Sequence, residues 1–188
     1  MMDILLASGG CLAAGIYIGY RLSTSRRKSK QTETLHVFFS RTSPSLKPSI
    51  TDTISQAEAT IEVATSLLTD RNIIGELCHA SKRGVRVRVL VDRHQLTDDS
   101  DCIKLARLLH DYGVQIKTHQ HEGTLNLSLL LCDKQQLLTG SPPFSRHAFQ
   151  HNDEILFLCK ESSAIHTCSR RFEEMWDEAV SYAFYSYK

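Results

Sequence analysis

The chain has 188 residues, of which 41% are hydrophobic, and a formal net charge of +1. This length allows one domain with a full core and excludes a second large domain. Five of the basic residues precede Gln31, so residues 31–188 carry 17 basic and 20 acidic residues. That part of the chain is slightly acidic and lacks the overall basic excess that nucleic-acid-binding proteins usually show.

The N-terminal segment contains a stretch, Ile4–Tyr20, without a charged residue. With its flanks it is just long enough to span a bilayer, so we predict a transmembrane helix over residues 1–22 and a basic linker over residues 23–34. Gly15 and Gly19 have a spacing that lets two such helices approach closely. Basic residues stay on the cytosolic side, which places the domain there. They are Arg21, Arg26, Arg27, Lys28 and Lys30.

A secretory signal peptide is the alternative interpretation of this segment. Its basic region would precede the apolar stretch, whereas only Asp3 is charged before it here. The order of charges therefore favours an uncleaved anchor.

The rest of the chain alternates apolar strand patterns with amphipathic helix patterns. This alternation predicts an α/β domain over residues 35–180, with a mixed sheet covered by helices on both faces, and a C-terminal tail over residues 181–188. Asp70 is expected to cap one helix, which stops at Gly84. Strands are expected at 35–40, 60–66, 85–91, 114–118, 125–132, 137–139 and 154–158, and helices at 48–57, 71–83, 99–112 and 163–179.

The strand at 85–91 alternates valines with Arg86 and Arg88, and Arg83 and Arg93 lie beyond its ends. These four arginines form a candidate basic patch for a phosphate backbone or an anionic lipid. A solvated strand edge is the alternative. Asp92, directly after the strand, is expected to cap its end.

The residues that point to a chemistry lie between positions 126 and 141. They read Asn126-x-Ser128-x4-Asp133-x6-Gly140-Ser141. This resembles the phospholipase D superfamily pattern His-x-Lys-x4-Asp-x6-Gly-Ser, with the His and the Lys replaced. The pattern lies on a predicted strand and its outgoing turn, where sheet proteins present residues to a crevice.

Further landmarks make the chain resemble the Zucchini group of that superfamily, also called mitochondrial cardiolipin hydrolases. The resemblance implies a phospholipase D-like fold, pairing of two subunits, and a single-pass location in the mitochondrial outer membrane. The family's Cys/His zinc insertion has no counterpart between Phe38 and Ile50, and the six cysteines lack zinc-site spacing, so no metal or cofactor is predicted. The landmarks are Lys82–Asp92, Tyr112–Ile116, Gln150, Asn152, Glu154 and Arg171–Trp176.

In active members, the resemblance implies, the motif His attacks phosphorus and the Lys neutralises the developing charge. The amide of Asn126 is neither a nucleophile nor a proton shuttle, and Ser128 has no charge. Pro143 replaces the asparagine usually found after Gly-Ser and removes an N–H. We therefore predict no intact catalytic set at Asn126, Ser128 and Asp133. Asp133 is expected to serve orientation or strand-end hydrogen bonding.

Hydrogen-bond donors survive in the motif, so a phosphate pocket could persist without its chemistry. The leading hypothesis is thus a membrane-anchored pseudoenzyme in piRNA-type or mitochondrial lipid pathways. It would bind RNA or an anionic phospholipid, or act as a homodimer or as a heterodimer with an intact paralogue. The candidate phosphate-binding residues are Asn126, Ser128, Ser141, Asn152 and Glu154.

Two other hypotheses stay open. One is an active phosphodiesterase, either a single-strand RNA endonuclease or a cardiolipin hydrolase, whose rearranged site uses His119, His121, His147 or His151. The other is a purely structural tether with a vestigial pocket.

Overall fold

The computed structural model describes residues 34–42, 45–95 and 100–182. The expected transmembrane helix and most of the basic linker lie outside these ranges. Within them, no helix is long and apolar enough to cross a membrane. One compact unit begins at Thr34.

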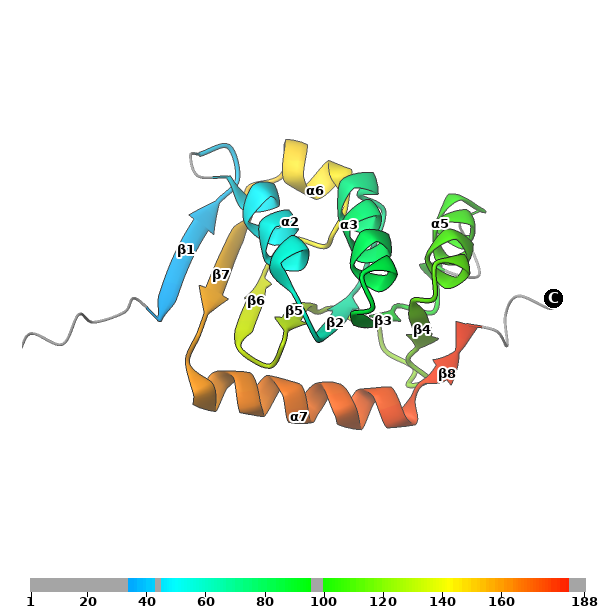
Figure 1. Cartoon of the computed structure of the whole chain (residues 1–188). Helices are drawn as coiled ribbons and strands as arrows, with labels where there is room; N and C mark the ends of the chain where they lie inside the picture. The colour runs from blue at the N-terminus through cyan, green and yellow to red at the C-terminus, as the bar shows by residue number, and fades with distance from the viewer. Residues whose placement is uncertain (1–33, 43–44, 96–99, 183–188) are drawn as a thin grey trace, which may run out of the picture. The chain divides into compact units, whose positions relative to one another are not determined.

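The described strands form one mixed sheet in the order β1-β7-β6-β5-β2-β3-β4-β8 (Figure 1). β2, β3 and β4 are parallel, whereas β5 runs antiparallel to β2 and continues into antiparallel β6, β7 and β1. The strands are β1 (Leu35–Phe39), β2 (Thr60–Thr65), β3 (Arg86–Val91), β4 (Gln115–Thr118), β5 (Ser128–Cys132), β6 (Gln136–Gly140), β7 (Ile155–Cys159) and β8 (Val180–Ser181).

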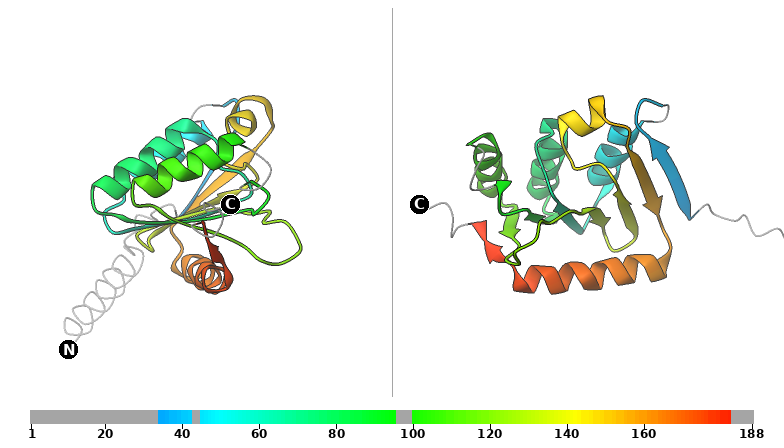
Figure 2. Two further views of the ribbon diagram at one scale, coloured as in Figure 1. Left: turned by 90° about the vertical axis from the view of Figure 1, so that its right-hand side faces the viewer. Right: turned by 180° about the vertical axis from the view of Figure 1, so that it is seen from behind.

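Helices cover both faces of this sheet, as the alternating pattern predicted (Figures 1 and 2). One face carries α2 (Leu46–Gln56), α3 (Arg71–Lys82), α5 (Ser100–Asp111) and the short α6 (Arg146–His151). The opposite face is crossed by α7 (Ser162–Glu178) alone among the described helices.

Local sequence signals set the ends of α3. The carboxylate of Asp70 accepts hydrogen bonds from the N–H groups of Asn72 and Ile73, which is the predicted N-cap. The helix ends before Gly84, whose φ of +91° is a conformation that glycine adopts without strain.

Two hydrophobic clusters lie on the two faces of the sheet. The larger joins α2, α3, α5 and α6 to the sheet through buried residues such as Ile54, Leu77 and Phe144. The smaller lies under α7, where the rings of Phe172 and Trp176 stack with centroids 5.7 Å apart. Both faces therefore exclude water, which explains why most strand residues are apolar in both directions.

The structure differs from the sequence predictions in three places. β5 begins at Ser128, because residues 125–127 approach the sheet as an irregular segment rather than as strand. The helix α6 was not predicted; Ser145 caps it by accepting a hydrogen bond from the N–H of Ala148. The sheet continues through β8 to Ser181, and the next residue, Tyr182, is buried.

Candidate functional site

The candidate site lies at one edge of the sheet, where strand ends of opposite polarity meet. β2 and β3 end at this edge. β5 begins at the same edge, since its first residue, Ser128, pairs with Thr65, the last residue of β2. A groove of about 600 Å³ opens at this edge. Its lining residues are Ser66, Leu67, Asp92, His94, Gln95, Cys102, Thr124 and Asn126.

Asp92 organises the rim of the groove. Its buried carboxylate accepts a hydrogen bond from the N–H of Leu125 through Oδ2 (2.7 Å) and from the N–H of His94 through Oδ1 (2.9 Å). One side chain thus fixes the segment that carries Asn126 and the turn that carries His94. The expected strand-end role of Asp92 is confirmed.

Ser128 is not available to a ligand in this arrangement. The residue is 6% exposed, and its Oγ donates a hydrogen bond of 2.6 Å to the carbonyl of Pro142. The hydroxyl at the motif's Lys position therefore makes an intramolecular hydrogen bond.

Ser141, Asn152 and Glu154 come together as one network. The Oγ of Ser141 donates to Oε2 of Glu154, and Nδ2 of Asn152 donates to Oε1 at 2.9 Å. Ser40, which the sequence did not single out, donates to the carbonyl of Asn152 and accepts from the N–H of Glu154, each at 2.9 Å. Glu154 is 8% exposed. Its carboxylate accepts hydrogen bonds from the neutral side chains of Ser141 and Asn152.

The glycine of the Gly-Ser pair has a steric reason. A Cβ at Gly140 would lie 2.1 Å from the backbone carbonyl oxygen of Ile155, a distance no side chain tolerates. This close approach lets the neighbouring Ser141 accept the N–H of Ile155 at 3.1 Å. Gly140 therefore positions the network of Glu154.

Asp133 lies at the other end of β5, roughly 16 Å from Ser128 for five residues of strand. Its carboxylate accepts three backbone N–H groups, those of Glu58 (3.0 Å), Ala59 (2.8 Å) and Thr60 (2.8 Å). Burial opposes ionisation, but the three hydrogen bonds outweigh it and lower the pKa of Asp133. The expectation of strand-end hydrogen bonding is confirmed.

The four arginines of the candidate basic patch do not share one exposed surface. Arg88 is 7% exposed and bonds to Glu62 and Glu173 beneath α7, because the face of β3 that seemed solvated is covered by this helix. Arg83 donates to the carbonyls of Ile54 and Ala57 at the end of α2. Arg86 and Arg93 lie at opposite ends of β3.

The four histidines proposed as substitutes differ in position. His119 follows β4 at the edge of the candidate site but is buried; its Nε2–H donates to the carbonyl of Gly123 at 2.7 Å, and it lies 3.9 Å from Asp92. His121 contacts the His119 ring, whereas His147 and His151 pair on α6. None of the four lines the groove.

His94 is the histidine that lines the groove, and sequence analysis missed it. The residue is exposed and comes two positions after Asp92. The available signal was its place just beyond the carboxyl end of a parallel strand, where functional residues of α/β sheets gather. Among the described residues, no three His, Cys, Asp or Glu side chains are arranged to hold a metal ion.

Comparison with known proteins identifies the family. The family model described as "Cardiolipin synthase, PLD-like domain" matches residues 50–176, more than half of the chain. The chain therefore belongs to the phospholipase D-like family.

Within this family, the chain is similar to proteins named mitochondrial cardiolipin hydrolase and phospholipase D. It is 29% identical over 109 residues to the mitochondrial cardiolipin hydrolase of Mus musculus. The aligned residues cover 57% of this chain and 48% of the relative. It is 28% identical over 113 residues to a phospholipase D of Rickettsia felis, covering 60% of this chain and 54% of that protein. The chain thus matches about half the length of these relatives.

Solved structures share the fold. The phospholipase D family member Nuc from Salmonella typhimurium superposes with a TM-score of 0.73 at 19% identity, over 79% of this chain and 97% of the other. NucT from Helicobacter pylori gives a TM-score of 0.68 at 18% identity, over 79% and 98%. The mixed sheet between helices is therefore the phospholipase D-like fold.

Proposed function

We propose that this chain is a phospholipase D-like domain that binds phosphate esters at the groove beside Asn126 without hydrolysing them. The observation that carries the proposal is the side chain in the groove at the motif's His position, which is the amide of Asn126. An amide donates and accepts hydrogen bonds but does not attack phosphorus at neutral pH.

The other polar groups of the motif are bonded within the chain and are not placed for chemistry. The hydroxyl of Ser128 bonds to Pro142, and the carboxylate of Glu154 bonds to Ser141 and Asn152. Loss of a catalytic nucleophile commonly lowers turnover by on the order of 10³-fold or more. The groove still offers the amide of Asn126 and the hydroxyls of Ser66 and Thr124 as hydrogen-bonding groups, which support recognition.

The proposal is tested with the full chain beside two variants, Asn126→His and Asn126→His/Ser128→Lys. Each is incubated with labelled single-stranded RNA, cardiolipin vesicles and a chromogenic phosphodiester. We expect no turnover by the unmodified chain and measurable turnover only after reversion. Because Ser128 is buried, a lysine there can prevent the double variant from folding, and the single variant then still tests the reversion of Asn126. Turnover by the unmodified chain would contradict the proposal.

A second candidate function is an active phosphodiesterase with a rearranged site. The observation that favours it is the imidazole of His94 in the groove, with its backbone N–H fixed by Asp92. This function predicts that any activity of the unmodified chain disappears in His94→Gln. The matched control is His79→Gln, since His79 is exposed on α3 and does not line the groove.

We further propose that the protein acts at a mitochondrial membrane, anchored by its N-terminal segment with the domain in the cytosol. The apolar stretch Ile4–Tyr20 and the names of its relatives support this. Fractionation of the full chain and of a variant lacking residues 1–30 tests it. Membrane association of the shortened variant equal to that of the full chain would exclude the anchor.

Pairing of two subunits is part of the same proposal. The resemblance to the Zucchini group implies that two subunits complete one site, so a homodimer or a heterodimer with an intact paralogue would place two grooves together. Sedimentation of the detergent-solubilised full chain measures the assembly. A monomer that binds none of the phosphate-bearing ligands would instead support a structural tether.

A further inference from the structure

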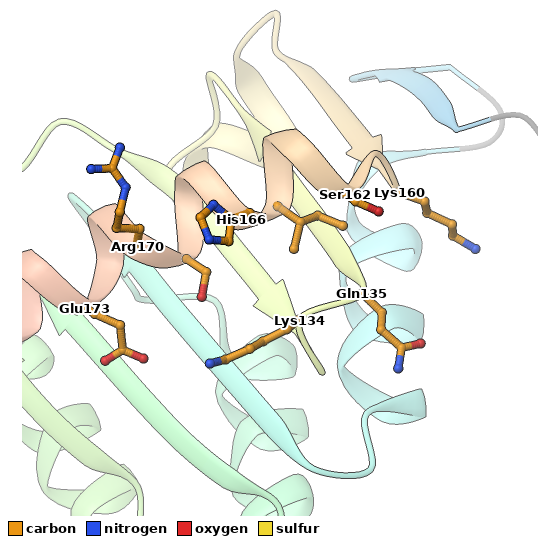
Figure 3. Close-up of a pocket in the computed structure, with 9 residues that line it drawn as sticks. Lys134, Gln135, Lys160, Ser162, His166, Arg170 and Glu173 are labelled. Atoms are coloured by element: carbon orange, nitrogen blue, oxygen red, sulfur yellow. The ribbon is translucent and has the colours of Figure 1, made fainter.

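A second groove, of about 670 Å³, lies between the first half of α7 and the turn that joins β5 to β6 (Figure 3). Its basic lining residues come from three separate segments: Lys134 from the turn, Lys160 from the connection before α7, and Arg170 from α7 itself. Ser162 and His166 on α7 add further polar groups. The chemistry of this lining is that of an anion-binding site.

One carboxylate also lines the groove, but it does not cancel these charges. Glu173 is engaged by Arg88, whose Nη1 and Nη2 lie 2.7 Å and 2.6 Å from its two oxygens. This hydrogen-bonded pair lowers the pKa of Glu173, with burial opposing it and the charges of Lys134 and Arg86 contributing further. Because Arg88 is shared with Glu62, it compensates the charge of Glu173 in part, and the three cations of the lining outnumber this one carboxylate.

Arg170 has a weak competing partner. Its Nη1 lies 3.6 Å from Glu174, and both side chains are largely exposed to water. An exposed pair of this kind contributes little free energy, so an incoming anion displaces it at small cost.

The turn holds the backbone of Lys134 in a defined conformation. Asp133 and Lys134 both have positive φ, 53° and 52°, and the Asp133 carboxylate accepts hydrogen bonds from three backbone N–H groups at and just before the start of β2. Figure 3 shows the Lys134 side chain extending from this turn toward α7. A fixed backbone reduces the entropy lost when the ammonium group binds a ligand.

We propose that this groove binds a phosphorylated ligand with at least two negative charges, at a site separate from the groove beside Asn126. The three cations extend from different segments around the groove, which suits a ligand that carries more than one anionic group, and the volume is that of a small-molecule site. β5 separates the two sites, since Asn126 precedes the strand and Lys134 follows it. A soluble diphosphate and a phosphomonoester lipid headgroup present the same chemistry.

The test measures binding of pyrophosphate and of glycerol 3-phosphate to the full chain by equilibrium dialysis. A triple variant, Lys134→Gln/Lys160→Gln/Arg170→Gln, removes the cations of the groove. A matched triple variant, Lys104→Gln/Arg107→Gln/Arg171→Gln, removes three exposed cations that do not line it. The midpoint of thermal unfolding without ligand verifies that both variants fold.

We expect the groove variant to bind pyrophosphate at least about tenfold more weakly, and the matched variant to bind like the unmodified chain. Tighter binding of pyrophosphate than of glycerol 3-phosphate identifies a diphosphate as the preferred ligand, and the reverse order identifies a phosphomonoester. No binding of either, or equal losses in both triple variants, would overturn the proposal. So would a loss confined to Asn126→Leu, which would assign the anion to the other groove.

Discussion

Arg88 and Glu173 form a two-point ion pair between the sheet and α7, with N–O distances of 2.7 Å and 2.6 Å. The same guanidinium reaches Glu62 at 2.5 Å on the neighbouring strand and lies 5.1 Å and 5.3 Å from the ring centroids of Phe172 and Trp176. This arrangement attaches α7 to the centre of the sheet.

Removing the guanidinium is therefore expected to destabilise the fold. Arg88→Met leaves the carboxylate of Glu62, which is 1% exposed, buried without a cation. Such a loss costs about 3–5 kcal/mol of the free energy of unfolding, measured by urea denaturation. The double variant Arg88→Met/Glu62→Leu should recover most of it, because no charge is then left buried. Equal stability of the single and double variants would contradict this account.

Asp133, in the turn after β5, is expected to make the stability of the fold depend on pH in acid. Since the folded-state pKa of Asp133 lies below its ordinary value of 3.8, its carboxylate adds stability at neutral pH. That stability is fully present above the unfolded pKa and is lost as pH falls through the folded one. Asp133→Asn should cost about 1–3 kcal/mol at pH 7 and flatten the dependence of stability on pH below about 5.

Asparagine is the informative replacement here because it tolerates the positive φ of 53° at this position. The variant thus tests the hydrogen bonds rather than the backbone conformation. Urea titrations at several pH values between 3 and 7 measure both quantities. Parallel pH profiles for the variant and the unmodified chain would exclude the proposed role of Asp133.

The network around Glu154 is expected to stabilise the edge of the candidate site. Ser141→Ala removes the hydroxyl that donates to Glu154 and accepts from Ile155, so a buried carboxylate oxygen loses a donor. A loss of about 1–3 kcal/mol is expected. Ser163→Ala is a suitable control, since its exposed hydroxyl makes only a 3.4 Å contact with Glu161. Similar losses in the two variants would show that the network around Glu154 adds no more stability than an exposed serine hydroxyl.

Much of the fold could be predicted because the sequence carries strong local signals. Alternating valines defined β3, and Asp70 with Gly84 bounded α3. The spacing from Asn126 to Ser141 placed the motif on a strand and its turn. The short elements were missed because α6 has six residues and β8 two, too few for a periodic pattern.

The missed parts of the candidate site depend on contacts between distant segments. Alternation shows that Arg86 and Arg88 share a face, but not that a helix beginning at residue 162 covers it. The place of His94 on the groove follows from the neighbouring β2 and β5 segments, which lie far from it in sequence. Spacing alone also could not show that the hydroxyl of Ser128 bonds to Pro142.

Gly140 gives the sharpest steric prediction. A Cβ at this position would meet the carbonyl oxygen of Ile155 at 2.1 Å and the Cα of Leu156 at 2.9 Å, and both are backbone atoms of a paired strand that cannot turn aside. Gly140→Ala should therefore cost more than about 3 kcal/mol or prevent folding, because β6 and β7 must separate.

The control is another glycine in the same chain. Gly75 lies within α3 and has no atom within 4 Å of the added Cβ, so Gly75→Ala should be neutral or stabilise the fold by up to about 1 kcal/mol through helix propensity. Urea denaturation of the two variants, with soluble yield as a second measure, compares them directly. If Gly140→Ala were as stable as Gly75→Ala, the close approach of β6 to β7 would be wrong, and with it the geometry that brings Ser141 to Glu154.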